Sequence, residues 1–223
     1  MSDLDRRPEA ETAYDDHLQR SERVWNRWSD WYRTSERDLE PARNDLIGAL
    51  DLAPGDDVLE VGCGPGVNFA TIREAIGPAG SLVAVEYSPE MVERATDRVE
   101  THGWENVTVV RADATTAALG GPYDAAIATL ALSVMPDVER AVRNVHDALA
   151  PGAPLGVLDV RPVPSGPLRI ANPFLRWFLR WYANWNPDGD VGEALEAVFG
   201  TVEGLETFAG GTLYSVTATR GEA

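Results

Sequence analysis

The stretch Asp57-Val-Leu-Glu-Val61, followed at once by Gly62-Cys-Gly-Pro-Gly66, decides the fold of this chain. A short run rich in aliphatic residues and bounded by glycines predicts a buried strand. The glycines allow a tight turn and let a ligand approach the backbone without Cβ atoms in the way. Residues 67–76 then show a helical pattern, and the start of such a helix offers free N–H groups to an anionic group. Together these residues predict the first strand, loop and helix of a parallel sheet.

The same alternation of strands and helices continues along the chain. Ser88-Pro89-Glu90 is a strong helix start, because serine suits the N-cap, proline the first turn and glutamate the positive end of the helix dipole. The βαβαβ order requires a parallel sheet with right-handed crossovers, so we predict a doubly wound α/β fold with helices on both faces. Residues 201–208 and 212–219 flank Gly210-Gly211, which predicts a hairpin and an antiparallel last strand. The other predicted strands are 57–61, 81–85, 107–110, 123–129 and 155–160, and the helices between them are 67–76, 88–101 and 137–150.

The region before the first strand is predicted to be helical. Its first 15 residues are polar and show no periodicity, so we expect them to fray. Residues 17–37 have a helical pattern, and residues 41–50 predict a second helix that ends before Ala53-Pro54-Gly55. We therefore divide the chain into an N-terminal helical lid, residues 1–50, and one α/β domain, residues 51–223.

The charge of the chain is strongly one-sided. It has 36 acidic residues against 19 basic ones, all of them arginine, which gives a net charge of −17. Such a surface repels phosphate backbones and disfavours a nucleic-acid substrate unless a local basic patch exists. An acidic chain without lysine is also typical of proteins adapted to molar salt, where ions screen the repulsion between carboxylates.

Other features of the composition bear on location. Cys63 is the single cysteine, so no internal disulfide can form, and a reducing location fits. The first residues lack the apolar stretch of a signal peptide. The longest nearly apolar run, residues 125–135, is too short for the ~20 residues that a membrane-spanning helix needs. We therefore expect a cytoplasmic protein without a transmembrane segment, and we find no cluster of metal ligands in the sequence.

Informative residues follow the predicted strands, where ligands bind in a doubly wound sheet. The loop reads G-x-G-x-G, whereas the dinucleotide fingerprint is G-x-G-x-x-G, so its glycines form either a ligand loop or an ordinary turn. Glu86 lies about 20 residues further on, the offset expected of an acid that accepts both ribose hydroxyls. Tyr87 is suited to lie against an adenine ring. Asp113 either accepts a hydrogen bond from the exocyclic amine of adenine or is a turn aspartate.

As a set, these motifs resemble those of the class I S-adenosylmethionine-dependent methyltransferases, whose fold is Rossmann-like. Val58-Leu-Glu-Val-Gly-Cys-Gly-Pro-Gly66 resembles their first motif, Val83-Ala-Val-Glu-Tyr-Ser-Pro-Glu-Met91 their second, and Arg111-Ala-Asp-Ala114 their third. Residues 123–129 and 149–152 resemble the later motifs. The match covers residues 56–160.

The resemblance implies S-adenosylmethionine as cofactor and assigns roles to single residues. Gly62 and Gly64 would lie on both sides of the methionine part, with Glu60 orienting its amino group. Thr129 and Leu130 would line the side of the methyl donor. The full set of implied cofactor residues is Glu60, Gly62, Cys63, Gly64, Gly66, Glu86, Tyr87, Met91, Asp113, Ala114, Thr129 and Leu130.

The methyl acceptor is less well specified. Methyl transfer is an in-line displacement, and a general base is needed only if the nucleophile must lose a proton. No motif for such a base stands out, because none of the three histidines follows a predicted strand, so the catalytic residues remain unknown. The Asn-Pro-Pro-Tyr-type motif of nucleic-acid aminomethylases is missing after residues 123–129, which argues against DNA as acceptor.

Six of the seven tryptophans lie in two segments that flank the cofactor domain. The first is the helical pattern of residues 17–37, and the second is an aromatic helical insertion at residues 161–187, which starts a helix at Asn172-Pro173. Three interpretations of the second segment stay open: a helix packed on the core, an aromatic substrate lid, or an interfacial helix at residues 172–186 that contacts anionic lipid. The tryptophans are Trp25, Trp28, Trp31, Trp177, Trp181 and Trp185.

The first aromatic helix resembles the N-terminal lid of quinone-biosynthesis and phospholipid N-methyltransferases, with Tyr32 at their recurrent tyrosine as a contact to the acceptor. Trp28, Tyr32, Trp177 and Trp181 form the predicted substrate lid. We thus predict a methyltransferase for a small or amphiphilic acceptor, such as a lipid or a quinone precursor, with peripheral membrane contact. Two alternatives remain, a nicotinamide-dependent oxidoreductase and a non-catalytic module that binds the cofactor.

Overall fold

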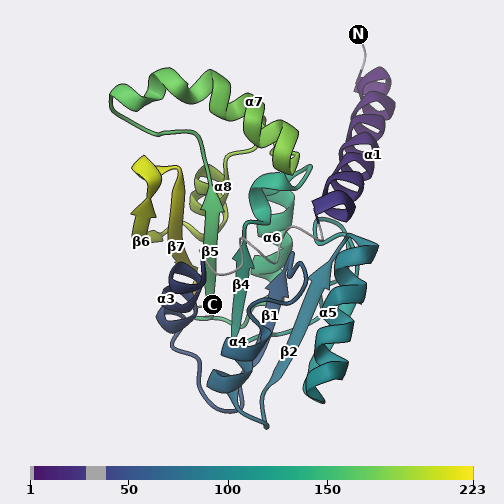
Figure 1. The fold of residues 1–223 in the computed structure, drawn as a ribbon, viewed down its shortest axis with the longest axis vertical. Helices are drawn as coiled ribbons and strands as arrows, with labels where there is room; N and C mark the ends of the chain where they lie inside the picture. Colours follow the sequence, from purple (N-terminus) through teal and green to yellow (C-terminus); the bar gives the residue numbers. More distant parts are fainter. Residues whose placement is uncertain (1–2, 29–38, 223) are drawn as a thin grey trace.

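The computed structural model describes residues 3–28 and 39–222, and the side chains of residues 12–27 and 39–222. In this part of the chain, seven strands form one sheet in the order β3-β2-β1-β4-β5-β7-β6 (Figure 1). β7 pairs antiparallel with β5 and β6, and the other neighbouring strands are parallel. The predicted, mostly parallel sheet with an antiparallel C-terminal strand is confirmed. The strands are β1 (Asp57–Val61), β2 (Ser81–Glu86), β3 (Val107–Arg111), β4 (Ala125–Thr129), β5 (Pro154–Val160), β6 (Val202–Phe208) and β7 (Leu213–Thr219).

Helices cover both faces of the sheet, as the sequence predicts. Successive strand residues point to opposite faces, so Val58 packs with α3, α4 and α5, whereas Leu59 packs with α6 and α8. Both side chains are fully buried, and the sheet therefore lies between two apolar layers. The helices are α1 (Asp3–Trp28), α3 (Glu40–Ala49), α4 (Phe69–Ile76), α5 (Pro89–His102), α6 (Val138–Ala148), α7 (Asn172–Ala183) and α8 (Val191–Phe199), with short 3-10 helices at Leu132–Val134, Pro167–Ala171 and Ala209–Gly211.

The predicted helix starts are formed by side-chain caps. Ser88 Oγ accepts a hydrogen bond from the backbone N–H of Met91, at 3.4 Å, and Pro89 is the first residue of α5. Asp137 Oδ1 accepts from the backbone N–H of Arg140, at 3.0 Å, at the start of α6. Both caps satisfy N–H groups that have no partner inside a helix.

The N-terminal helix differs from the prediction. α1 begins at Asp3, so the expectation that the first 15 residues fray is wrong. From Tyr14 onward, side chains of α1 bind the loops that follow three strands, as described below. α8, at Val191–Phe199, also lacks a counterpart in the prediction. The predicted helix of residues 17–37 is confirmed to Trp28, and its remainder, with Trp31 and Tyr32, lies outside the described residues.

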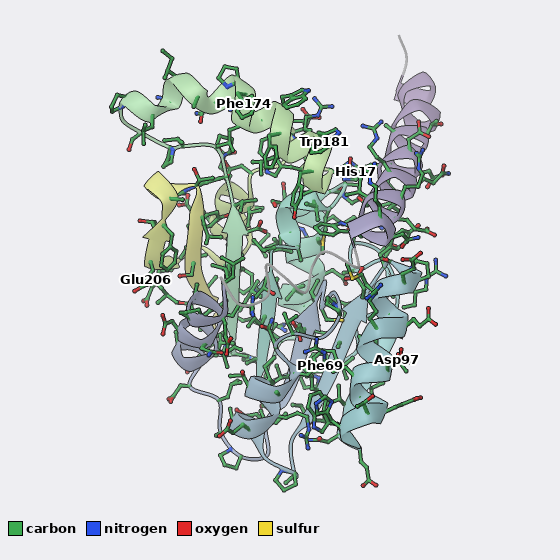
Figure 2. All side chains as sticks on the ribbon, in the orientation of Figure 1. His17, Phe69, Asp97, Phe174, Trp181 and Glu206 are labelled. Atoms are coloured by element: carbon green, nitrogen blue, oxygen red, sulfur yellow. The ribbon has the colours of Figure 1, made fainter. Side chains whose placement is uncertain are left out.

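The predicted aromatic helix is α7, and it runs along the top of the molecule in Figure 1. It begins at Asn172, as the sequence indicates, and ends at Ala183 because Asn184 adopts the left-handed conformation, with φ 56°. Asn184 Nδ2 donates to the backbone oxygen of His17, at 3.1 Å, and to Ser21 Oγ, at 2.7 Å. The end of α7 is thus fixed to α1 (Figure 2). Trp185 lies beyond the helix and is buried, so it leaves the stripe that Trp177 and Trp181 form.

Candidate functional site

A pocket of about 90 Å³ lies at the carboxyl ends of β1 to β4, beneath α1. This is the place where a doubly wound sheet binds its ligands. β1 is the point at which the strand order reverses, because β2 lies on one side of it and β4 on the other. The residues around the pocket are Gly62, Gly64, Val85, Glu86, Tyr87, Ser88, Met91, Ala112, Asp113, Ala114, Thr129, Leu130, Ala131, Val134, Met135 and Pro136, together with Leu18, Ser21, Glu22 and Trp25 of α1.

The glycine loop after β1 has two functions. Gly62 has φ 66°, and a Cβ atom there would lie 2.4 Å from the Cβ of Ala131, so this position requires glycine for packing. Gly64 has φ 53°, but a Cβ atom there would meet nothing within 4 Å. Since Gly64 lines the pocket, it leaves open space on the ligand side of the loop. Gly66, with φ 77°, instead packs against the ring of Phe69 and does not line the pocket.

Glu86 holds this loop in place. Its Oε2 accepts from the backbone N–H of Gly64, at 3.0 Å, and its Oε1 accepts from the N–H groups of Tyr87 and Ser88, each at 2.8 Å. Burial raises the pKa of Glu86, whereas the three N–H groups favour its ionised form. A carboxylate has about four acceptor positions. Glu86 therefore keeps room for a hydroxyl donor from a ligand.

Asp113 lies at the next strand end and is bound by α1. Its Oδ1 accepts from the backbone N–H of Thr115, at 2.9 Å, and its Oδ2 accepts from Thr116 Oγ1, at 3.0 Å. Tyr14 of α1 donates its hydroxyl to the same Oδ2. Burial, and then this hydrogen bond, raise the pKa of Tyr14, so the phenol keeps its proton and remains a donor. Tyr14 therefore takes up acceptor capacity on the residue expected to bind adenine.

A buried polar group lies behind the pocket. Glu60 is fully buried, and its Oε1 accepts from Asn68 Nδ2 at 2.8 Å. Asn68 Nδ2 also donates to Thr129 Oγ1, at 3.1 Å, and Thr129 lines the pocket. Glu60 Oε2 and Asn68 Oδ1 are both buried without a hydrogen-bond partner in the described part of the chain. Burial raises the pKa of Glu60 to about 8, which the hydrogen bond from Asn68 only partly opposes.

α1 closes the pocket by binding several strand-end loops at once. His17 Nε2 is 2.8 Å from the backbone oxygen of Val134, beyond β4. Ser88 Oγ donates to Asn26 Oδ1, at 2.8 Å, beyond β2. With Tyr14 on Asp113, α1 thus reaches the ends of β2, β3 and β4.

The segment after β4 is held in an unusual conformation. Leu130 has φ 55°, which is uncommon for a residue with a branched side chain, and its backbone N–H donates to the oxygen of Leu158 at 2.7 Å. Ser133 binds Asp159 twice, through its N–H at 3.0 Å and through its Oγ at 2.6 Å. Asp159 is fully buried at the end of β5, and burial raises the pKa of its carboxyl group. These contacts place Leu130 at the pocket.

The structure brings most of the predicted cofactor residues to one pocket and separates the others. Glu60, Cys63 and Gly66 do not line it, and Cys63 is buried under the loop. The predicted lid residues Trp177 and Trp181 also lie elsewhere, on an outer groove beside α7. The side chain of Trp28 and all of Tyr32 are outside the described residues. The predicted residues that line the pocket are Gly62, Gly64, Glu86, Tyr87, Met91, Asp113, Ala114, Thr129 and Leu130.

Several site residues had no place in the sequence prediction. Tyr14 lies in the first 15 residues, where no pattern was found, and Leu18, Ser21 and Glu22 lie in the predicted helix of residues 17–37 without being singled out. The spacing of Tyr14, Leu18, Ser21 and Trp25 at three or four residues was the available signal, since it places them on one helix face. Asp159, an acid inside a buried strand, was a second signal.

The described residues offer neither a metal site nor a membrane-spanning helix. No group of three or more His, Cys, Asp or Glu residues there is arranged to hold a metal ion. None of the helices in the same residues is both long and apolar enough to cross a membrane.

Comparison with known proteins agrees with this geometry. Residues 58–152 match a family described as "Methyltransferase domain". A protein-L-isoaspartate O-methyltransferase of Ignicoccus hospitalis is 39% identical over 93 residues, which are 41% of this chain and 44% of that protein. Nocamycin O-methyltransferase of Saccharothrix syringae is 28% identical over 139 residues, 59% of this chain and 50% of that protein. The chain thus spans about half, or less, of the curated relatives it matches.

Solved structures show the same fold. A SAM-dependent methyltransferase from Aquifex aeolicus superposes with a TM-score of 0.60 at 19% identity, and the superposition covers 79% of this chain and 88% of that one. The likeness is one of fold, a Rossmann-like sheet flanked by helices, and the family match places a methyltransferase domain within it. Residues 58–152 thus match a methyltransferase domain, and the class I methyltransferases that the motifs resemble take S-adenosylmethionine as cofactor.

Proposed function

We propose that the protein transfers a methyl group from S-adenosylmethionine to a small or amphiphilic acceptor of the lipid or quinone-precursor type. One observation carries the proposal: Gly62, Gly64, Glu86, Asp113 and Thr129, from four successive strand ends, line one pocket. The names of the relatives support methyl transfer, since both are O-methyltransferases, of protein L-isoaspartate and of nocamycin.

The polar groups present fit the cofactor, but the pocket of about 90 Å³ is smaller than the ~300 Å³ at the low end of ligand sites, so α1 would move to admit it. The open space at Gly64 allows a ligand to lie against the bare backbone of the loop. Glu86 and Asp113 would accept hydrogen bonds from the ribose and the adenine amine. Glu60 Oε2 and Asn68 Oδ1 are buried without a partner among the described residues, and both would accept hydrogen bonds from the amino group of the cofactor. That amino group would reach them past Thr129, which lines the pocket and binds Asn68. When bound, S-adenosylmethionine supplies a methyl group activated by a sulfonium, and the surrounding carboxylates favour that positive charge.

The acceptor end of the pocket is apolar. Leu18 and Trp25 of α1 line the same pocket as Leu130, Val134 and Met135 beyond β4. Apolar walls with few polar groups are typical of sites for apolar small molecules. This composition favours an acceptor with an apolar part over the peptide acceptor that the isoaspartate enzymes are named for. α1, within the proposed lid of residues 1–50, would exclude water and orient the acceptor.

Calorimetric titration tests the cofactor. S-adenosylmethionine and its demethylated product should bind, and nicotinamide dinucleotides should not. Asp113→Asn should weaken donor binding roughly tenfold, because a hydrogen bond to a charged group contributes about 1.5–3 kcal/mol. Asp97→Asn is the matched control, since Asp97 is an exposed acid on α5 (Figure 2). Binding of the nicotinamide cofactor alone would establish the oxidoreductase instead.

A transfer assay separates the enzyme from a silent binding module. The purified protein is incubated with labelled donor and either a catechol-type quinone precursor or phosphatidylethanolamine. We expect label in one of these amphiphiles, and less of it with Trp25→Ala. Tight donor binding without transfer to either acceptor would contradict the proposed acceptor class.

A further inference from the structure

A second, larger groove lies on the outside of the molecule between α1 and α7. Its volume is about 670 Å³. Arg20 and Arg27 of α1 and Arg176 and Arg180 of α7 line it, and no carboxylate among residues 12–27 and 39–222 does. The other lining residues are Val24, Pro173, Trp177, Trp181 and Pro187. Four arginines therefore converge on one groove in a protein that has nearly twice as many acidic as basic residues.

The sequence around α7 shows the same reversal of charge. Residues 161–187 contain four of the 19 basic residues and none of the 36 acidic ones. The rest of the chain has more than twice as many acids as arginines. An anionic partner is therefore repelled by most of this protein and attracted by the face that α7 presents.

The same face is apolar and exposed. Of the eight large hydrophobic side chains exposed in the described part of the chain, six lie between residues 168 and 181. Their exposed fractions are 60% for Leu168, 89% for Ile170, 66% for Phe174, 59% for Trp177, 36% for Phe178 and 53% for Trp181. A contiguous exposed apolar patch marks an interaction surface.

The arginines and aromatic rings occupy adjacent strips of α7. Leu179 and Ala183 are buried and face the protein. At 100° per residue, the aromatic strip lies opposite them, with Trp177 and Trp181 stacked at 6.3 Å and nearly parallel. Arg176 and Arg180 lie between the buried and the aromatic strips, on the groove side. Figure 2 shows Phe174 and Trp181 on α7 at the top of the molecule.

We propose that this basic–aromatic face, formed by the groove and by residues 168–181, docks on a membrane with anionic headgroups. The arginines would bind the headgroup phosphates, and the aromatic and aliphatic side chains would enter the boundary between headgroups and acyl chains. A helix with cations on one strip and Trp and Phe on the next has the composition of an interfacial helix. Charge complementarity favours an anionic partner, and a bilayer offers both anionic headgroups to the four arginines and an apolar phase to Trp177 and Trp181, which line the same groove. The inference does not depend on methyl transfer.

Flotation of the full-length protein with vesicles, without methyl donor, tests this inference. The protein should bind vesicles of phosphatidylcholine with phosphatidylglycerol, and should bind pure phosphatidylcholine at least tenfold less well. Arg176→Gln with Arg180→Gln should lower the affinity roughly tenfold to thirtyfold. Arg140→Gln with Arg143→Gln is the control, since it removes the same charge from exposed positions of α6 and should leave binding unchanged.

The apolar strip is tested by Trp177→Ser with Trp181→Ser, which should also lower vesicle binding at least tenfold. Both side chains are more than half exposed, so an unchanged midpoint of thermal unfolding shows that the fold is intact. Equal binding to both kinds of vesicle, or no binding, overturns the inference. A third outcome also overturns it: inorganic phosphate raises the thermal stability, the effect requires the same arginines, and vesicles are not bound. That outcome would indicate a site for a soluble anion. Loss of a dimer in the Trp177→Ser, Trp181→Ser variant would indicate a second copy of the chain as the partner.

Discussion

The buried carboxyl group of Glu60 makes the stability of the folded protein depend on pH. Its pKa is about 8 in the folded protein against an ordinary value of 4.5. Below pH 4.5 both the folded and the unfolded states hold the proton, so this group contributes no difference. Between pH 4.5 and 8 the unfolded chain releases the proton while the folded protein keeps it. Stability therefore falls as pH rises through this window.

The size of the effect follows from the shift. One pKa unit corresponds to about 1.4 kcal/mol, so Glu60 costs roughly 3 kcal/mol of stability at pH 7 and roughly 5 kcal/mol above pH 8. Glu60→Gln keeps the size of the side chain and the oxygen that accepts from Asn68, and it removes the charge. The variant should therefore match the wild type near pH 4 and exceed it by about 3 kcal/mol at pH 7.

Urea unfolding of both proteins over a pH series, at constant ionic strength, measures this difference. Glu203→Gln, at an exposed position of β6, is the control and should give no comparable gain. A gain for Glu60→Gln that is independent of pH, or a loss at every pH, would refute the reasoning. The variant should also bind S-adenosylmethionine less tightly, because it cannot ionise beside the amino group of the donor.

Substitutions at four further positions give distinct outcomes. Gly62→Ala forces a methyl group onto Ala131 and should lower the free energy of unfolding by about 3 kcal/mol. Gly64→Ala should lower it by only about 1 kcal/mol and should mainly weaken donor binding. Urea unfolding measures the loss of stability, and calorimetry measures the loss of donor binding. Tyr14→Phe removes the hydroxyl that α1 donates to the carboxylate after β3, so it should lower stability by about 1 kcal/mol and tighten donor binding severalfold; unchanged affinity would show that the phenol does not compete with the donor. Asn184→Ala should lower the free energy of unfolding by about 2 kcal/mol and Asn184→Gly by about 1 kcal/mol. Both variants lose the two hydrogen bonds to α1, but glycine adopts the left-handed conformation without strain. Equal losses of stability in thermal denaturation would contradict this reasoning.

Local patterns predicted the sheet well. β1 follows from five residues and the glycines behind them, and the prediction of its bounds was correct at both ends. The caps at Ser88 and Asp137 were equally local, since each depends on a side chain and a backbone N–H three residues away. The hairpin of β6 and β7 follows from Gly210-Gly211 between two strand patterns.

Contacts between distant parts of the chain could not be predicted in this way. Tyr14 and Asp113 are 99 residues apart, and nothing near Tyr14 indicates the carboxylate that fixes it. The aromatic spacing of Trp177, Trp181 and Trp185 suggested one continuous stripe, but a single left-handed residue at position 184 buries the last ring. Sequence placed Trp177 and Trp181 on a helix, and only the packing of that helix shows which surface they form.

α1 contributes to both recognition surfaces of the molecule. Leu18, Ser21 and Trp25 face the pocket, while Arg20 and Arg27 face the groove. Any displacement of α1 that admits the nucleoside of the cofactor to the pocket would also move Arg20 and Arg27 in the groove. Thermodynamic linkage then makes the coupling reciprocal: if adsorption to a bilayer changes the affinity for the methyl donor, the donor changes the affinity for the bilayer by the same factor. Through α1, membrane binding and occupation of the cofactor pocket would thereby be coupled.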